Sequence, residues 1–351
     1  MPETTHVRQG EELDMDRLAS YLADTLGHGS GLLKIEQFPA GASNLTYLVR
    51  LGDAEYVLRR PPFGNTVKTA HDMAREYNVL SKLSAVYTPA PRPLLFCDDE
   101  AVIGSEFYLM ERRKGLVIRG RAPLEMQESP ELQTAVCRSF IKNLADLHGI
   151  DHEAAGLGDL GKPEGYNRRQ VEGWIKRYLA AKTDEWPELE SAIGWLGGNI
   201  PAESGAALIH NDYKFDNVML DAGDLTRITA VLDWEMVTIG DPLMDLGTTL
   251  GYWISGDAGD EMLSMPFNPR VLMENISRSD MVEMYSAASG RNVSNILFYY
   301  IFGTFKIAVI AQQIYARYVK GFTRDERFAS FDRFVAALGR IARTAIDRGT
   351  I

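Results

Sequence analysis

The chain has 351 residues, of which 45% are hydrophobic and 24% are charged, a composition typical of a globular protein with one large domain or two lobes. Its 37 Lys and Arg residues against 48 Asp and Glu residues give a formal net charge of −11, which argues against general nucleic-acid binding but leaves room for a local basic pocket. The two cysteines, Cys97 and Cys137, lack any metal-ligand spacing, and we expect them to be reduced core residues.

The N-terminal segment bears on where the protein acts. Residues 1–22 are polar and contain no apolar core of a signal peptide. The longest apolar run, at 296–303, is too short to span a bilayer. We therefore expect a cytoplasmic protein with no membrane partner.

The first third of the chain alternates between helical and strand-like patterns. Residues 11–27 have a helical period, and three strand-like runs separated by turn residues follow. A second helical pattern at 69–84 precedes two more strand-like runs. The five strands are expected at 32–38, 44–51 and 55–60, within 93–100, and within 101–115.

The remainder of the chain is mainly helical. Two short strands, at 218–220 and 228–232, flank a turn that contains Gly223. The pattern predicts a small β-rich N-terminal lobe, residues 1–112, and a larger α-rich lobe, residues 113–351. Helices are expected at 129–148, 167–182, 185–197, 242–255, 279–288, 292–319 and 324–348.

Residues 207–217 read ALIHNDYKFDN, a charged cluster directly after an apolar run. Asp212 and Asn217 are five residues apart, and Asp233 follows sixteen residues later, behind the second short strand. Phosphoryl transfer needs one carboxylate that accepts the proton of the attacking hydroxyl, and an amide oxygen and a second carboxylate that hold Mg²⁺. The alternative is a polar loop followed by an unrelated Asp, and the position of Asp233 after an apolar strand argues against it.

With these residues in view, the sequence resembles the aminoglycoside phosphotransferase and choline kinase-like family of the protein kinase-like fold. HNDYKFDN at 210–217 resembles the catalytic loop, and Asp233 resembles the second metal-binding Asp. GDPLMDLG at 240–247 and LADLHGID at 144–151 resemble the segments after and before it. The resemblance covers residues 28–320 and implies an α+β bilobal fold, with a small antiparallel sheet in the first lobe and ATP and Mg²⁺ as cofactors.

Five further segments narrow the resemblance to the phosphotransferases associated with acyl-CoA dehydrogenases. That group includes a kinase-like domain fused to such dehydrogenases in animals. Since this chain contains no dehydrogenase portion, we expect a stand-alone version. The segments are GASNLTYLV at 41–49, YVLRRPPFG at 56–64, HDMAREYNVL at 71–80, FYLMER at 107–112 and NRRQVEGWIKRY at 167–178.

The resemblance implies that the first lobe binds the nucleotide. Arg59 stands where protein kinases use Lys to contact the phosphates, with Glu76 as its expected partner and Arg60 as the alternative if the register shifts by one. Both Arg59 and Glu76 could instead be ordinary exposed charges. Small residues at the first hairpin would let N–H groups approach phosphates, although an ordinary turn explains them as well. The hairpin residues are Gly41, Ala42, Ser43 and Asn44, and the crossover residues expected beside the adenine are Met110, Glu111 and Arg112.

The fold also implies roles for residues around the proposed base, Asp212. His210 is expected to pack the catalytic loop rather than to act as a base. Asp245 is expected to accept hydrogen bonds from amides of that loop. Lys214 either stabilises the transferring phosphoryl group or faces solvent.

The acceptor is less well defined than the phosphate donor. Segment 160–190 is rich in Lys, Arg and aromatic residues, which favours an anionic acceptor over a cationic antibiotic, unless these charges form a solvated helix face. The subgroup resemblance implies a hydroxyacyl-CoA or a hydroxy acid. The expected acceptor contacts are Tyr166, Arg169, Trp174 and Trp234, although buried aromatic residues usually only pack.

Other functions remain open from the sequence. A non-catalytic nucleotide-binding scaffold that regulates a partner enzyme would explain the arginine in place of lysine, but it needs no base such as Asp212. An aminoglycoside kinase is a further alternative. A protein kinase is disfavoured, because only seven residues separate Asp233 from Asp241, too few for an activation segment. The sequence leaves open ATP or GTP as donor, and whether helices at 292–348 form a homodimer contact or only complete the lobe.

Overall fold

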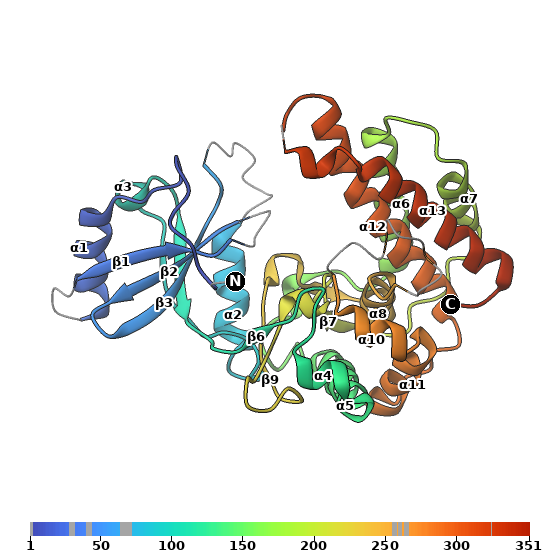
Figure 1. Ribbon diagram of the computed structural model, residues 1–351, viewed down its shortest axis with the longest axis horizontal. Coiled ribbons are helices and arrows are strands. Elements are labelled where there is room, and N and C mark those ends of the chain that lie inside the picture. The colour runs from blue at the N-terminus through green and yellow to red at the C-terminus, as the bar shows by residue number, and fades with distance from the viewer. Residues whose placement is uncertain are drawn as a thin grey trace. The chain divides into compact units, whose positions relative to one another are not determined.

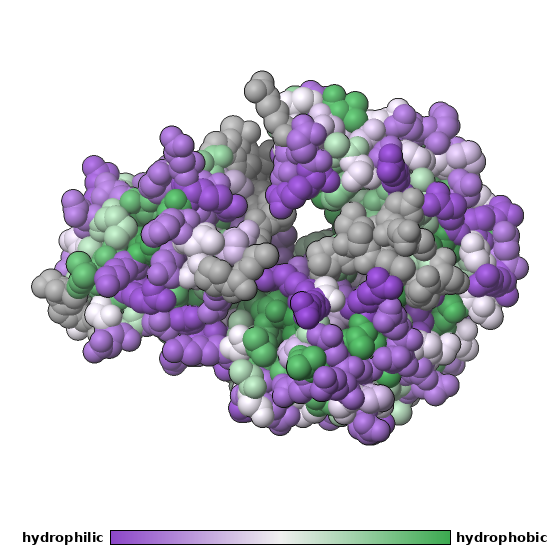
Figure 2. All heavy atoms as spheres, in the orientation of Figure 1, coloured by the Kyte–Doolittle hydropathy of each residue, from purple (hydrophilic) through white to green (hydrophobic). Residues whose placement is uncertain are grey.

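The computed structural model describes residues 3–27, 32–39, 44–63, 72–254, 258, 262, 267–323 and 325–351. The chain divides into two compact units, Met1–Lys114 and Gly115–Ile351 (Figure 1). The division falls within the segment 111–115 at which the sequence changes from β-rich to α-rich patterns. Hydrophilic side chains cover most of the face of each unit that is seen in Figure 2.

The first unit is built on a five-stranded antiparallel sheet with the strand order β1-β2-β3-β5-β4. The β2–β3 hairpin turns at Gly52, whose φ of +58° is a conformation that glycine adopts without strain. The first three strands match their expected positions to within one residue at each end. The strands are β1 (Leu33–Gln37), β2 (Leu45–Leu51), β3 (Ala54–Arg60), β4 (Pro93–Cys97) and β5 (Phe107–Glu111).

Three helices accompany this sheet, namely α1 (Met15–Leu26), α2 (Met73–Leu83) and α3 (Glu100–Ile103). Asp14 and Asp72 cap α1 and α2, since each side chain accepts a main-chain hydrogen bond from the first turn. Figure 1 shows α1 and α2 on opposite sides of β1–β3. The strand expected within 101–115 is wrong in its first part, because Asp99 caps the short helix α3 and Gly104 ends it with a φ of +82°.

The pleat of β3 and β5 separates two faces of the sheet. Leu58 and Leu109 belong to the hydrophobic cluster that includes the buried residues of α1. Their neighbours Arg59 and Tyr108, which pair with each other across the two strands, therefore point to the other face. On that face Tyr108 contacts Tyr77 of α2, with ring centroids 6.4 Å apart. The position of Arg59 on the α2 side follows directly from this alternation.

The second unit is mainly helical, with two small sheets of strand order β6-β8-β9 and β10-β7. Its helices are α4 (Leu124–Glu128), α5 (Pro130–His148), α6 (Tyr166–Ala181), α7 (Pro187–Gly198), α8 (Pro242–Gly251), α10 (Arg270–Asn275), α11 (Arg278–Ser289), α12 (Ile296–Val319) and α13 (Phe331–Arg348). Its strands are β6 (Leu116–Val117), β7 (Ala207–Ile209), β8 (Val218–Leu220), β9 (Ile228–Val231) and β10 (Thr238–Gly240). Short 3-10 turns are η1 (Gly158–Leu160), η2 (Phe215–Asn217), η3 (Trp234–Met236) and η4 (Glu326–Phe328).

The longer elements of this unit and the short strands β8 and β9 follow the sequence pattern, whereas the other short elements do not. Helices α4 and α10 and strands β6, β7 and β10 were not expected, because elements of two to six residues show no measurable period. Helix α8 ends at Gly251 rather than at 255, and α13 begins at Phe331 rather than at 324. These differences lie at element ends, where the periodic signal is weakest.

Helices α8 and α12 approach each other at backbone distance (Figure 1). A Cβ atom on Gly247 of α8 would collide with the carbonyl of Tyr299, and one on Gly303 of α12 would collide with the carbonyl of Gly247. Only glycine fits at the two positions without a shift of one helix. The contact holds α12 against the GDPLMDLG segment.

Helix α12 is longer than the apolar run noted in the sequence. In the part of the chain that the structure describes, it is the one helix that is long and apolar enough to span a bilayer, by length and composition alone. However, 78% of its most apolar window is buried inside the second unit. A core helix meets the same criteria, so the helix gives only weak evidence for a membrane span.

Candidate active site

The loop that carries the charged cluster lies between two strands of the second unit. Strand β7 ends at Ile209 and pairs with β10, and β8 begins at Val218 and pairs with β9. Between them, η2 closes when the amide of Asn217 donates to the carbonyl of Lys214 at 2.9 Å. The strands thus fix both ends of the loop formed by residues 210–217, which we call the catalytic loop.

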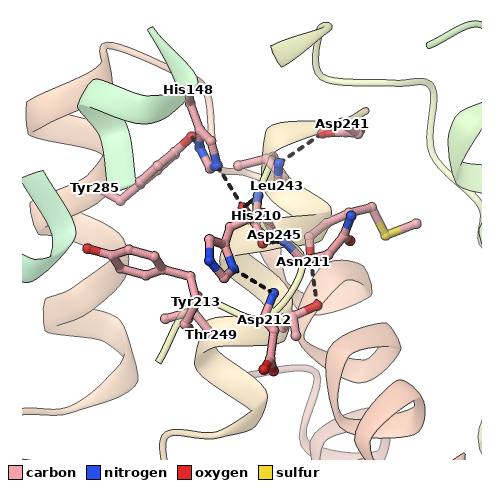
Figure 3. Close-up of polar contacts among 12 residues, drawn as sticks. His148, His210, Asn211, Asp212, Tyr213, Asp241, Leu243, Asp245, Thr249 and Tyr285 are labelled. Atoms are coloured by element: carbon pink, nitrogen blue, oxygen red, sulfur yellow. Dashed lines mark hydrogen bonds and ion pairs between the residues drawn. The ribbon is translucent and has the colours of Figure 1, made fainter. Parts of the chain in front are cut away.

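Asp245, fully buried in the first turns of α8, anchors the start of the catalytic loop (Figure 3). Its Oδ2 accepts the amide of His210 at 2.6 Å, and its Oδ1 accepts the amide of Asn211 at 2.7 Å. His148 donates from Nε2 to Oδ2 at 3.2 Å, and its Nδ1 lies 2.7 Å from the Tyr285 hydroxyl. Burial alone would raise the pKa of Asp245, but the hydrogen bonds and the two histidines lower it below its ordinary value. These contacts are the ones expected for this residue.

The His210 ring is fully buried and holds the loop from the inside. Its Nδ1 accepts the amide of Asp212 at 3.3 Å, and its Nε2 lies 2.9 Å from the carbonyl of Leu232. Because an amide can only donate and a carbonyl can only accept, the ring carries its proton on Nε2. Both ring nitrogens are therefore engaged by the main chain, as a residue that packs the loop requires.

Asn211 has a φ of +69°, a left-handed conformation that few residues other than glycine adopt. Its amide is held by Asp245, and its Nδ2 donates to the carbonyl of Met236 at 3.0 Å. Its own carbonyl accepts from Nζ of Lys306 at 2.7 Å, and its side chain forms a hydrogen bond with the Tyr166 hydroxyl. Contacts from four separate segments stabilise this strained residue and fix the direction in which the chain enters the next position.

The Asp212 carboxylate is the centre of the site, and each of its oxygens has a partner. Oδ2 accepts from Nδ2 of Asn217 at 2.9 Å and from Nζ of Lys214. Oδ1 accepts from the hydroxyl of Tyr252 at 2.8 Å. The Asp212 side chain is still 18% exposed. A carboxylate that is held in one orientation but remains reachable can accept the proton of a bound hydroxyl.

Asn217 and Asp233 are the expected metal ligands, and their chemistry suits Mg²⁺. Nδ2 of Asn217 donates to both the carbonyl and the carboxylate of Asp212, which fixes the amide orientation and leaves Oδ1 as a cation ligand. Asp233 lies at the start of η3 with a φ of +66°. Among the described residues, no group of three or more His, Cys, Asp or Glu side chains could hold a metal. Mg²⁺ commonly takes one or two protein oxygens and completes its shell with phosphates and water, so this donor set fits it.

Among the residues that contact the catalytic loop or its anchor, His148, Tyr252 and Lys306 were missed by the sequence reasoning. His148 lies in the LADLHGID segment, and Tyr252 directly follows α8, so each adjoins a segment already singled out. Lys306 lies 95 residues after Asn211, within the largely apolar first two thirds of helix α12. The lysine inside a long apolar run could have identified Lys306 as a candidate site residue, because burial of an ammonium is costly and therefore rare.

In the first unit, Arg59 forms an ion pair with Glu76 of α2, with 3.4 Å between Nη1 and Oε1. Their side chains are only 9% and 2% exposed, so neither is an ordinary surface charge. Arg60 points to the opposite face, where it donates to the carbonyls of Ile103 and Pro61 at 2.9 and 3.1 Å. The pairing therefore favours Arg59 over Arg60 as the basic group beside α2.

The other expected nucleotide contacts are placed in part. Asn44 is buried at the start of β2, and Met110 is buried in β5. The Glu111 carboxylate accepts a main-chain amide at 2.7 Å, and Arg112 pairs with Glu55 at 2.5 Å, so both side chains are engaged within the first unit. Outside the described residues lie Gly41, Ala42 and Ser43.

Two of the expected acceptor contacts lie close to the catalytic loop. Tyr166 is buried beside Asn211, and burial raises the pKa of its hydroxyl above the ordinary value. The Trp174 ring lies close to two cations, with the Arg177 guanidinium 4.7 Å and Nζ of Lys306 5.7 Å from its centroid. Tyr166 therefore contacts the loop directly, whereas Trp174 is linked to it through Lys306.

Trp234 and Arg169 are placed differently from the expectation. Trp234 is 1% exposed and donates from its indole to the carbonyl of Val231 at 2.8 Å, so it supports the loop from the core and does not line an acceptor cleft. Arg169 donates to the carbonyls of Lys162 and Glu164, which holds the turn before α6. These two donors of Arg169 are therefore used locally.

Comparison with known proteins places the chain in a family. The family model described as the phosphotransferase enzyme family matches residues 34–266. Acyl-CoA dehydrogenase family member 11 of Gallus gallus is 34% identical over 345 residues, which cover 96% of this chain but 44% of the chicken protein. The chain thus spans less than half the length of that relative.

Solved structures agree with this assignment. A candidate aminoglycoside phosphotransferase from Ralstonia eutropha is 29% identical, with a TM-score of 0.81 over 96% of this chain and 99% of that one. A thermostable variant of the aminoglycoside phosphotransferase APH(4)-Ia, solved with AMP-PNP and hygromycin B, is 16% identical and shares the fold, with a TM-score of 0.59 over 94% and 98% of the two chains. The α+β kinase-like fold expected from the sequence is confirmed. Since the family model covers more than half of its length, the chain belongs to the phosphotransferase enzyme family.

Proposed function

We propose that the chain is a magnesium- and ATP-dependent kinase that phosphorylates the hydroxyl group of a small anionic compound, with a hydroxyacyl-CoA or a hydroxy acid as the leading acceptor. The observation that carries the proposal is the Asp212 carboxylate. It is oriented by Asn217, Lys214 and Tyr252, yet it is still partly exposed. This is the arrangement that a general base for an alcohol requires.

The proposed reaction is a direct phosphoryl transfer. Asp212 accepts the proton of the acceptor hydroxyl as that oxygen attacks the γ-phosphorus of ATP. A new oxygen–phosphorus bond forms on the acceptor, while the bond from the γ-phosphorus to the β–γ bridging oxygen breaks and ADP leaves with its electron pair. Lys214, which contacts the same carboxylate, stabilises the charge on the transferred group. Asn217 and Asp233 would hold Mg²⁺, which would supply positive charge to the phosphates when bound.

The nucleotide contacts are assigned to the first unit. The Arg59 guanidinium is oriented by Glu76 and offers a bidentate donor pair for phosphate oxygens. The main chain of residues 110–112 is proposed to bind the base. The structure of APH(4)-Ia with AMP-PNP supports an adenine nucleotide as donor.

An anionic acceptor is supported by the charges around Trp174. The Arg177 guanidinium lies 4.7 Å from the centroid of its ring, and Arg168 lies exposed on the same helix, α6. Such groups attract phosphate or carboxylate and repel a polycation. The relatives named as acyl-CoA dehydrogenases favour an acyl-CoA compound with a hydroxyl group.

An aminoglycoside acceptor is the second candidate. It is favoured by the candidate aminoglycoside phosphotransferase at 29% identity, while the basic residues of α6 count against it. A non-catalytic nucleotide-binding scaffold is the third reading, and it gives no reason for the three hydrogen bonds that orient Asp212.

The test is ADP release from Mg-ATP across a panel of alcohols. The panel contains hydroxyacyl-CoAs, free hydroxy acids, choline, sugars and aminoglycosides. Asp212→Asn is expected to lower kcat by at least about 100-fold while nucleotide affinity is kept, because the general base is lost. Asp216→Asn is the matched control, since it removes a carboxylate of the same loop whose partner is Arg119.

The outcomes separate the candidates. Turnover of an anionic hydroxy compound that Asp212→Asn loses and Asp216→Asn keeps would support the proposal. Turnover of aminoglycosides alone would favour the second candidate. Nucleotide binding without turnover of any panel member would favour the scaffold, and absence of nucleotide binding would contradict every nucleotide-dependent reading.

A further inference from the structure

Lys306 is a buried cation in the middle of α12. The residue is 2% exposed, and across the described ranges no carboxylate lies within ion-pairing distance of its ammonium. Burial lowers the pKa of Lys306 to about 8, although the charges of Asp245 and Asp212 partly offset this effect. An apolar side chain would fill the same space at a lower free energy, so the lysine calls for a functional explanation.

The hydrogen bonds of Lys306 go to one residue. Nζ donates to the carbonyl of Asn211 at 2.7 Å, and the side-chain Oδ1 of the same residue lies at 3.4 Å. That carbonyl belongs to the peptide group that joins Asn211 to Asp212. The ammonium therefore holds the peptide plane directly before the proposed base.

The packing of α12 on α8 explains how the lysine reaches the loop. Gly303 lets the two backbones touch, and Lys306 follows three residues later on the same face of the helix. On α8, Asp245 holds the amide of Asn211, while on α12 Lys306 holds its carbonyl. The two helices thus clamp opposite ends of a single left-handed residue.

We propose that Lys306 is a positioning residue of this active site, which holds the Asn211–Asp212 peptide so that Asp212 presents its carboxylate to the acceptor hydroxyl. The inference rests on the proposed kinase function, because positioning matters for turnover only if Asp212 acts on the acceptor. Misplacement of a reacting group by about 1 Å can lower a rate by about 100-fold, so a single hydrogen bond at this peptide is enough to matter.

The experiment compares Lys306→Met, Lys306→Arg and the wild type by amide hydrogen exchange and by steady-state kinetics. Gln312→Leu is the matched control, because Gln312 is also buried on α12 but bonds to Trp186 and Ala181, away from the loop. In Lys306→Met, the amides of the catalytic loop should exchange at least about 10-fold faster, and kcat should fall by about 100-fold with nucleotide affinity within about twofold. Lys306→Arg should retain part of the amide protection of the loop and part of kcat.

The control and the outcomes keep the two proposals apart. Gln312→Leu should lower the Tm while loop exchange and kcat stay near the wild-type values. Wild-type exchange of the loop in Lys306→Met would overturn the inference, and so would faster exchange with an unchanged kcat. If the wild type turns over no acceptor, the proposed function fails, and loop exchange alone then decides whether Lys306 holds the peptide. If Lys306→Met does not fold, Lys306→Gln takes its place in the same comparison.

Discussion

Arg59 and Arg60 are neighbours in β3 but face opposite sides of the sheet, and their contacts predict different effects. Arg59→Met should weaken nucleotide binding by about 10-fold, since it removes one charged phosphate contact. Arg60→Met should lower the Tm, because the Ile103 and Pro61 carbonyls lose their donor. Titration with an ATP analogue and thermal unfolding of both variants measure the two effects. Stronger loss of affinity in Arg60→Met would contradict the assignment.

Tyr252 tests whether the orientation of Asp212 matters. Tyr252→Phe removes the hydroxyl that donates to Oδ1 but keeps the buried ring beneath Lys214, whose ammonium lies 4.9 Å from the ring centroid. We expect kcat to fall by about 10-fold, because the free energy of one hydrogen bond to a charged group corresponds to a rate change of that size. Nucleotide affinity should change little. Steady-state kinetics at saturating acceptor measure the effect. An unchanged kcat would show that Asn217 and Lys214 suffice to orient the carboxylate.

At the level of elements, the contact between α8 and α12 makes a prediction opposite to helix propensity. Ala normally stabilises a helix interior relative to Gly by about 1 kcal/mol, but a Cβ on Gly303 would collide with the backbone of Gly247. Gly303→Ala should therefore destabilise the protein by about 1–3 kcal/mol. Gly194→Ala in α7 is the control, since a Cβ there meets nothing within 4 Å, and it should stabilise slightly. Urea unfolding of both variants measures the two changes in the free energy of unfolding. Equal changes would rule out the close contact between α8 and α12.

The elements also show which part of the fold the sequence predicts. β2 and β3 were expected to within one residue, because each repeats apolar residues and ends at a turn signal. Strand β7 was missed, although it begins the stretch ALIHNDYKFDN, because three apolar residues have no period. Its partner β10 pairs with it from 29 residues downstream, at Thr238↔Ile209, and local patterns do not report such a contact.

Across the whole molecule, the site contacts expected from the residues alone lie within one short loop, whereas the contact of Asp245 with His210, 35 residues away, was expected from the family resemblance. Asp212 and Asn217 share one short loop, so their meeting needs no knowledge of the tertiary fold. Tyr252 lies 40 residues from Asp212, and Lys306 lies 95 residues from Asn211. Their contacts depend on how α8 and α12 pack, which single-sequence patterns do not reveal. The depth at which Trp234 is buried was not predicted for the same reason, because the surrounding core sets it.

Lys306 makes the stability of the protein depend on pH in a direction that can be tested. Its pKa is about 8 in the folded protein against an ordinary 10.5, so between these values the unfolded chain binds the proton more tightly. The free energy of unfolding should therefore rise with pH between pH 8 and 10.5. Below pH 8 the buried lysine is charged and lowers the free energy of unfolding by on the order of 3 kcal/mol. The facing charges are Asp245 and Asp212, which raise the pKa, and Lys214 and Arg177, which lower it. Because other groups titrate in the same range, the quantity to measure is the difference in free energy of unfolding between wild type and Lys306→Met, from urea titrations at pH 7, 8.5 and 10. As the pH rises, the free energy of unfolding of the wild type should increase relative to that of Lys306→Met. A constant difference would mean that the lysine keeps its ordinary pKa.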